Sequence, residues 1–224
     1  MITKDNRQNV HQEINHIFQD LFPTQGMAER PAQTALSHRM LDAILDGHIA
    51  LCDAGTGIGK TYAYLAAGVV FHRFQGAVGT EPKSLLISTS SIALQSAILN
   101  EYLPLLSRLL MADGLLDSPV RAVIRKGKSH YVCDERLMRR LRNVDLSKKN
   151  KLAADALLSM KDHLDLDAAE HLSGYDRERV RVPEICDCKQ EECRYRCFLA
   201  DCDSGHFHFQ ICNHNLLLAD AIHR

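Results

Sequence analysis

The chain has 224 residues, of which 46% are hydrophobic and 25% are charged, so it is long enough for one large domain or a domain with an insertion. Its formal net charge of -1 excludes no class of partner, because local charge matters more than the sum. Its apolar runs are shorter than a membrane span and its first residues lack the apolar core of a signal peptide, so we expect a cytoplasmic protein without membrane partners.

Two helices are expected before any strand. Apolar residues recur at helical spacing from Val10 to Leu21, and Pro23 follows as a stop. A second helix should begin at Pro31, and Gly47 is placed to end it.

Strands and helices then alternate. The apolar run Ile49–Cys52 predicts a strand, and a helix should follow from Lys60 to about residue 74. A buried strand is expected over Leu85–Ser88, and another helix over residues 91–111. This order is typical of βαβ units, so we predict an α/β fold with a parallel sheet.

A glycine-rich stretch, "DAGTGIGKTYAYL" at positions 53–65, joins the first expected strand to its helix. The backbone N–H groups of such a loop form an anion site at the positive end of a helix dipole. Lys60 would reach the β- and γ-phosphates of ATP, and the Thr61 hydroxyl would hold Mg2+. The candidate nucleotide-binding residues of the loop are Ala54, Gly55, Thr56, Gly57, Ile58, Gly59, Lys60 and Thr61.

Ala54 stands where the common form of this motif has its first glycine, and the loop therefore resembles the Walker A motif of superfamily 2 helicases of the DinG/XPD (Rad3-related) group. That group carries an upstream Arg-x-x-Gln element whose glutamine reads the adenine, and "RPAQ" supplies Arg30 and Gln33 as candidate nucleotide-binding residues. "LLISTSSIALQ" is similar to motif Ia of the group, which implies that Thr89 and Gln95 contact the DNA backbone. By themselves, such residues at a strand end are also ordinary turn residues.

Eight cysteines without an export signal indicate metal binding or buried thiols rather than disulfides. One isolated cysteine before a close cluster is similar to the way in which DinG/XPD helicases bind a [4Fe-4S] cluster. The ligands that this resemblance implies are Cys133, Cys188, Cys193 and Cys197, with Cys186 and Cys202 as substitutes. The spacing alone also allows a zinc site, or cysteines that bind no metal. Cys52 and Cys212 are expected to be small buried residues.

Positive charge gathers in the segment that follows the expected motor elements. Residues 121–151 contain eleven Lys or Arg residues against three acidic ones, which favours contact with a phosphate backbone or simply gives a solvated helix face. Lys126 and Lys128 are candidate DNA-binding residues. Tyr131 and Tyr195 are candidates for base stacking or for packing around the cysteines.

Two further elements are expected after the basic segment. Leu152, Ala156, Leu157, Met160 and Leu164 recur at helical intervals and predict one long helix over residues 147–172. "HFHF" at 206–209 predicts a half-buried strand with His206 and His208 on the solvent face.

The resemblance implies a RecA-like P-loop motor domain with an incomplete parallel sheet and a mainly helical iron-sulfur insertion. We expect the motor portion over residues 1–120, the insertion over 121–205 and a return to the motor over 206–224. The implied function is ATP-dependent 5'-to-3' unwinding of single-stranded or forked DNA in DNA repair, with ATP, Mg2+ and a [4Fe-4S] cluster as cofactors. The alternative is a nucleotide-binding accessory module with structural zinc.

An acidic Walker B motif is missing from the expected pattern. A run of four apolar residues followed by Asp-Glu does not occur in the 224 residues. We therefore expect the Walker B strand and the second motor domain to follow Arg224, and we expect the chain alone to be inactive as an ATPase.

Overall fold

The computed structural model describes residues 3–143, 151–186 and 193–223. The chain divides into two units, which are described separately. The first unit comprises Met1–Ile124 and Ser204–His214, and the second comprises Arg125–Asp203 and Asn215–Arg224. Among the helices in the described ranges, none has both the length and the apolar character needed to cross a bilayer.

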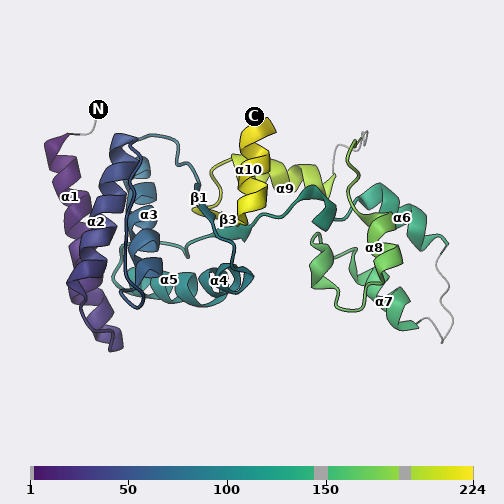
Figure 1. The fold of residues 1–224 in the computed structure, drawn as a ribbon, viewed down its shortest axis with the longest axis horizontal. Coiled ribbons are helices and arrows are strands. Elements are labelled where there is room, and N and C mark those ends of the chain that lie inside the picture. Colours follow the sequence, from purple (N-terminus) through teal and green to yellow (C-terminus); the bar gives the residue numbers. More distant parts are fainter. Residues whose placement is uncertain (1–2, 144–150, 187–192, 224) are drawn as a thin grey trace. The chain divides into compact units, whose positions relative to one another are not determined.

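The first unit starts with helices and continues with alternating strands and helices (Figure 1). Its α-helices and strands are α1 Lys4–Asn15, α2 Pro31–Asp46, α3 Lys60–Ala77, β1 Leu85–Ser88, α4 Ile92–Ala97, α5 Leu103–Ala112, β2 Ala122–Ile124 and β3 Phe209–Cys212. A π-helical segment, His16–Leu21, and a 3-10 turn, Phe22–Gln25, follow α1. A π-helical segment, Ile98–Tyr102, joins α4 to α5. The helices predicted to start at Pro31 and Lys60 are confirmed, and Gly47 ends α2 with a φ of 64°.

The sheet is parallel and has the order β1-β3-β2. Phe209 of β3 stands opposite both Leu85 and Ala122. Because β3 is the central strand, all four of its residues are buried, and Cys212 is the small buried residue predicted. The parallel α/β arrangement is confirmed, whereas β2 is a strand that the sequence did not reveal.

His208 corrects the prediction of a solvent-facing histidine. Its side chain is buried, while His206 is exposed as expected. The backbone N–H of Arg121 donates to His208 Nδ1 at 3.1 Å, which ties the residue before β3 to the chain that enters β2. Burial lowers the pKa of His208 to about 4, so the ring is neutral at pH 7.

The strand predicted over Ile49–Cys52 is wrong. Within the described chain this segment pairs with no strand, and Ile49 and Leu51 are fully exposed. Cys52 is accordingly half-buried rather than part of a strand. An apolar run becomes a strand only where a neighbour supplies ladder hydrogen bonds and a surface to pack on, and the described sheet offers neither here.

Helix α3 packs closely on the sheet and on α2. A Cβ atom at Gly68 would lie 2.5 Å from the Phe209 ring, so only glycine allows this approach. The Ser37 hydroxyl of α2 donates to the Ala63 carbonyl of α3 at 2.8 Å in a buried position. The start of α3 is therefore fixed by a packed core.

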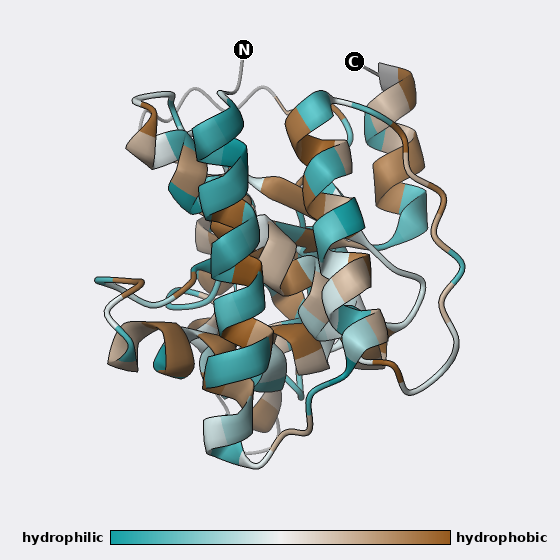
Figure 2. Ribbon diagram, turned by 90° about the vertical axis from the view of Figure 1, so that its left-hand side faces the viewer, coloured by the Kyte–Doolittle hydropathy of each residue, from teal (hydrophilic) through white to brown (hydrophobic). Residues whose placement is uncertain are grey.

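On the outer side of the first unit, the ribbon of α1 carries mostly hydrophilic residues (Figure 2).

The second unit is mainly helical. Its helices are α6 Asp134–Leu141, α7 Lys151–Ser159, α8 Gly174–Val180 and α9 Arg194–Asp203, and α10 His214–His223 begins at the last residue of the first unit. Its main core comprises Val132, Leu137, Leu157, Met160, Leu166, Ala169, Leu172 and Val180, with Leu141 and Ala156 packed against it.

The single long helix predicted over residues 147–172 is wrong in its length, because α7 ends at Ser159. Residues 144–150 lie outside the described ranges. The Asp165 carboxylate accepts the backbone N–H of Asp167 at 2.9 Å and caps a short 3-10 turn, Leu166–Ala168. A cap of this kind competes with continued helix.

Candidate functional site

The glycine-rich loop meets α3 at Gly59 in a left-handed conformation. Gly57 has a φ of 81° and Gly59 a φ of 87°, values that other residues rarely adopt. Helix α3 begins at Lys60, and among the residues that the structure describes no side-chain hydrogen bond caps it at Gly59. The first backbone N–H groups of α3 therefore remain suited to an anion, and Thr61 is the second residue of the helix.

Helix α2 holds the loop from the side. Gln33 Nε2 donates to the Gly59 carbonyl at 2.8 Å, and Arg30 Nη1 donates to the Gly57 carbonyl at 2.8 Å. The Gln33 side chain is buried. Gln33, the residue expected to read adenine, and Arg30 of the same element thus lie beside the loop, and in this structure they support its backbone.

Lys60 folds back over its own loop. Its Nζ donates to the carbonyls of Ala54 and Gly55, each at 2.9 Å. An ammonium group carries three donors, so a phosphate has to compete with these two carbonyls for the same charge. The exposed position of Lys60 leaves it able to make that exchange.

Thr89 and Gln95 lie together at the end of β1. Gln95 Nε2 donates to the Thr89 carbonyl at 3.1 Å, and the Thr89 hydroxyl accepts the Ser91 N–H at 3.2 Å. The Gln95 amide is buried. Both side chains therefore build the turn between β1 and α4, and their role toward DNA stays a prediction.

Backbone hydrogen bonds on both sides hold the segment around Cys133. The N–H of Val132 donates to Leu164 at 2.9 Å, and the N–H of Cys133 donates to Val180 at 2.8 Å. The Tyr131 carbonyl accepts the Val182 N–H at 2.8 Å. Cys133 itself is buried, so its thiol is fixed in a dry environment.

The chain around Cys193 is bonded to the residue after Cys133. Arg194 contacts both carboxylate oxygens of Asp134, with Nε to Oδ1 at 2.7 Å and its backbone N–H to Oδ2 at 3.1 Å. The Arg194 guanidinium also donates to the Met160 carbonyl at 3.0 Å. Cys193 is buried as well, so one ion pair joins the segments that carry two of the predicted ligands.

Aromatic packing completes this neighbourhood. The Tyr131 ring lies 5.3 Å from that of Tyr195 and 5.1 Å from that of Phe198, both on α9. Tyr131 and Tyr195 therefore pack beside the cysteines, the second of the two roles considered for them. Burial raises the pKa of Tyr131 to about 12, and its hydroxyl accepts the Lys126 N–H at 2.9 Å.

The other cysteines differ in exposure. Cys186 and Cys197 are exposed, and Cys202 is buried, which raises the pKa of its thiol. Cys188 lies outside the described residues. Within the described ranges, no three His, Cys, Asp or Glu side chains are arranged to hold a metal ion. The burial and proximity of the Cys133 and Cys193 segments fit a thiolate-bound metal, and the complete ligand set stays a prediction.

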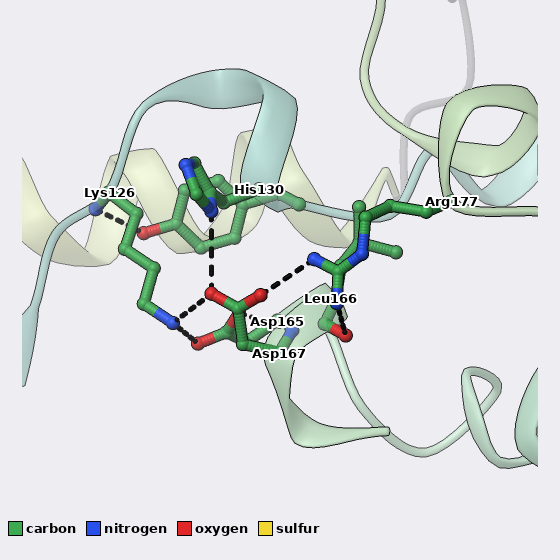
Figure 3. Close-up of polar contacts among 7 residues, drawn as sticks. Lys126, His130, Asp165, Leu166, Asp167 and Arg177 are labelled. Atoms are coloured by element: carbon green, nitrogen blue, oxygen red, sulfur yellow. Dashed lines mark hydrogen bonds and ion pairs between the residues drawn. The ribbon is translucent and has the colours of Figure 1, made fainter. Parts of the chain in front are cut away.

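Lys126 is engaged by two carboxylates. Its Nζ lies 2.6 Å from Asp165 and 2.7 Å from Asp167, and Asp167 also pairs with Arg177 at 2.6 Å and with His130 at 3.3 Å (Figure 3). These pairs fix the loop before α8 against the chain that leads to Cys133. Sequence reasoning missed this network, because its partners lie about forty residues apart.

Lys128, the other candidate DNA-binding lysine, makes a different contact. Its Nζ donates to the Glu184 carbonyl, a neutral acceptor. The charge of Lys128 is therefore uncompensated by that contact, whereas the charge of Lys126 is matched by Asp165 and Asp167.

Replacing Asp167 with asparagine should lower the free energy of unfolding at pH 7 by about 1 kcal/mol, a modest value because the carboxylate is partly exposed. Partial burial acts to raise the pKa of Asp167, but the hydrogen bonds and charges of Lys126 and Arg177 outweigh it and lower the pKa below its ordinary 3.8. The stabilisation that the Asp167 carboxylate provides is therefore complete above its ordinary pKa of 3.8. It is lost as the pH falls from there toward the lower pKa of Asp167 in the folded protein.

Urea unfolding at pH 7 and pH 3 measures this effect. Wild type should lose more stability than Asp167→Asn between the two pH values, and Asp162→Asn, an exposed control in the same unit, should behave as wild type. Equal losses in wild type and Asp167→Asn would show that this carboxylate does not stabilise the loop.

No protein-family model matches the chain. The 3'-5' exonuclease DinG of Bacillus subtilis is 35% identical over 108 residues, which are 48% of this chain and 10% of that protein. The ATP-dependent DNA helicase DinG of Photobacterium profundum is 38% identical over 85 residues, 38% of this chain and 10% of that protein. The ATP-dependent DNA helicase YoaA of Escherichia coli is 35% identical over 112 residues, 50% of this chain and 15% of that protein.

The matched segments cover only 10% to 15% of the length of these relatives. They cover 38% to 50% of the present chain. The chain is therefore related in sequence to the DinG and YoaA proteins, and the DinG-type resemblance predicted from its motifs is confirmed.

Proposed function

We propose that this chain supplies the nucleotide-binding loop and the cysteine region of an ATP-dependent DNA helicase of the DinG type. The observation that carries the proposal is the glycine-rich loop that α2 holds at the start of α3, in a chain related to named DNA helicases. The loop joins a lysine, a hydroxyl and a helix N-terminus, which together suit a triphosphate with Mg2+.

Each loop residue has a proposed role. Lys60 leaves the Ala54 and Gly55 carbonyls to pair with the β- and γ-phosphates, and Thr61 holds Mg2+. Gln33, which already contacts the loop, reads the adenine, and Arg30 belongs to the same nucleotide-binding element. The first unit then corresponds to part of a RecA-like motor domain. Its parallel sheet and the packing of α3 on β3 support this correspondence.

The second unit is proposed to bind a [4Fe-4S] cluster through Cys133, Cys188, Cys193 and Cys197. The burial of Cys133 and Cys193 and the Asp134–Arg194 ion pair between their segments support this assignment. When bound, such a cluster cross-links the segments that carry its thiolates and is held by four of them.

DNA in single-stranded or forked form is the proposed substrate. Lys128, whose charge is not matched by its carbonyl partner, is available to a phosphate. Lys126 would have to exchange Asp165 or Asp167 for a phosphate, and Thr89 and Gln95 would offer polar groups at the end of β1. Such contacts position a strand without reading its sequence. Movement in the 5'-to-3' direction is the polarity that the resemblance implies.

Replacing Lys60 with alanine tests the nucleotide site. A hydrogen bond to a charged partner contributes about 1.5–3 kcal/mol, so MgATP binding should weaken roughly tenfold to a hundredfold. Isothermal titration of MgATP into wild type and Lys60→Ala measures the change. Lys83→Ala, which removes an exposed charge before β1, should bind MgATP as wild type does. Equal affinity in wild type and Lys60→Ala would refute the assignment of the loop.

A further inference from the structure

Helices α6 and α8 of the second unit border a basic hollow of about 470 Å³. Four arginines, one tyrosine and one acid contribute to its wall: Arg136, Arg139, Arg140, Arg179, Tyr175 and Glu178. This composition concentrates positive charge around an aromatic ring, and no role proposed above uses it.

Tyr175 presents a large aromatic surface to solvent. The residue is 59% exposed, and the Cζ atoms of Arg179 and Arg140 lie 4.6 and 5.6 Å from the ring centroid. Arg140 is fixed by buried Asp176, with Nε and Oδ1 2.6 Å apart, and the Ser173 hydroxyl also donates to Asp176 at 2.8 Å. The Arg179 and Arg140 guanidinium groups therefore lie over the ring, and a buried carboxylate fixes Arg140.

The charges of the hollow are only partly compensated. Arg139 pairs with Glu135 and Arg140 with Asp176, whereas neither Arg136 nor Arg179 has a carboxylate partner among the described residues. Arg136 donates to the neutral Arg181 carbonyl at 3.5 Å and Arg179 lies over the Tyr175 ring, so neither contact neutralises the charge that an anionic ligand would meet.

The basic surface continues into a second hollow of about 430 Å³. The two hollows share Arg136 and Glu178, and the second also includes Lys128 and Arg181. Glu178, the acid common to both, pairs with Arg181 at 2.8 Å. Basic side chains therefore line both hollows, as far as Lys128, together with the acids Glu178 and Glu184.

We propose that the α6–α8 hollow binds single-stranded nucleic acid, with one base stacked on Tyr175 and neighbouring phosphates paired with Arg136 and Arg179. An exposed ring beside arginines suits an unpaired base, because a base within a duplex is already stacked on its neighbours. An acidic peptide would use the arginines but would leave the ring without a matching planar partner. This inference rests on the proposed function for the class of ligand, and it requires neither ATP nor a metal cofactor.

Fluorescence anisotropy of a labelled fifteen-residue oligothymidine, titrated with the full chain without nucleotide, tests the proposal. Tyr175→Ala should weaken binding about tenfold, and Tyr175→Phe, which keeps the ring, should stay within about twofold of wild type. With an oligonucleotide of the same length that lacks bases, wild type and Tyr175→Ala should bind equally. A structural role for Tyr175 would weaken both probes alike.

The arginines are tested by salt dependence. Arg136→Ala and Arg179→Ala should each reduce the slope of log affinity against log salt by roughly 0.7, the value for one phosphate of a single strand. Arg108→Ala, which removes an exposed charge from the first unit, should leave the slope unchanged.

The proposal is overturned if Tyr175→Ala binds oligothymidine as wild type does, or if it weakens binding of the abasic strand equally. It is also overturned if a DNA duplex or a polyglutamate peptide competes as well as the single strand. Thermal unfolding of each variant confirms its folding. MgATP binding at Lys60 is measured separately, so a failure here leaves the nucleotide assignment standing, and the reverse also holds.

Discussion

Replacing Gly59 with alanine is expected to weaken MgATP binding at least tenfold and to lower the free energy of unfolding by about 1–2 kcal/mol. Its φ of 87° is strained for any residue with a Cβ atom. The new methyl group would also lie 2.1 Å from Gln33 Nε2, so the side chain that holds the loop must leave. Titration calorimetry and urea unfolding measure the two effects.

Two other glycines provide matched controls. Gly57→Ala imposes a similar strain, at a φ of 81°, but meets no atom within 4 Å, so its effect should be smaller than that of Gly59→Ala. Gly76 lies inside α3 with open space around it, and Gly76→Ala should leave MgATP binding unchanged and raise stability by about 0.5–1 kcal/mol. If all three variants bind MgATP equally well, the backbone at Gly59 does not shape the nucleotide site.

Replacing Cys133 with serine should remove most of the bound iron and lower the thermal stability of the second unit. The proposed cluster needs four thiolates, and a serine hydroxyl is a poor substitute. Because ligand binding to the folded state stabilises it, loss of the cluster should also loosen the segments that meet at Tyr131. Iron and sulfide content per chain, with the visible spectrum, measures the loss.

Cys212→Ser is the matched control for that variant. Cys212 is buried in the central strand β3 and has no proposed ligand role, so its replacement carries a similar packing cost. It should retain the metal content of wild type. Equal metal loss in Cys133→Ser and Cys212→Ser would mean that misfolding, and not the loss of a ligand, explains the result.

Local signals in the sequence predicted much of the first unit. Pro31 and Gly47 mark the ends of α2, and Ser91, whose hydroxyl accepts the Leu94 N–H, marks the start of α4. The glycine-rich loop also predicted where α3 begins. These features depend on residues that are neighbours along the chain, so a single sequence is enough to reveal them.

Features that depend on distant partners were not predictable in the same way. Ile49–Cys52 has strand composition but no pairing strand in the described chain, whereas the three residues of β2 acquire theirs only through β3. His208 has the pattern of an exposed position, but it lies just before β3, where its ring packs against that of His72 and accepts the Arg121 N–H. Local periodicity indicates which element a segment can form, but the pairing and burial of that element depend on neighbours that are distant in the sequence.

The candidate sites show the same division. The loop residues and Arg30 were recognised from motifs, and the structure places them together. The hydrogen bond between Arg194 and Asp134 joins residues sixty positions apart. The Tyr175 ring has a cationic environment because Arg140 of α6 and Arg179 of α8 both contact it. Neither arrangement leaves a motif in the sequence, because each arises only when the second unit folds.

The assignment to an iron-sulfur helicase is tested most directly by iron, sulfide and zinc analysis of the chain purified without oxygen. We predict about four irons and about four sulfides per chain, with a broad visible absorption that bleaches on reduction. A colourless protein with about one zinc and no sulfide per chain would contradict the assignment and would instead indicate a structural zinc site.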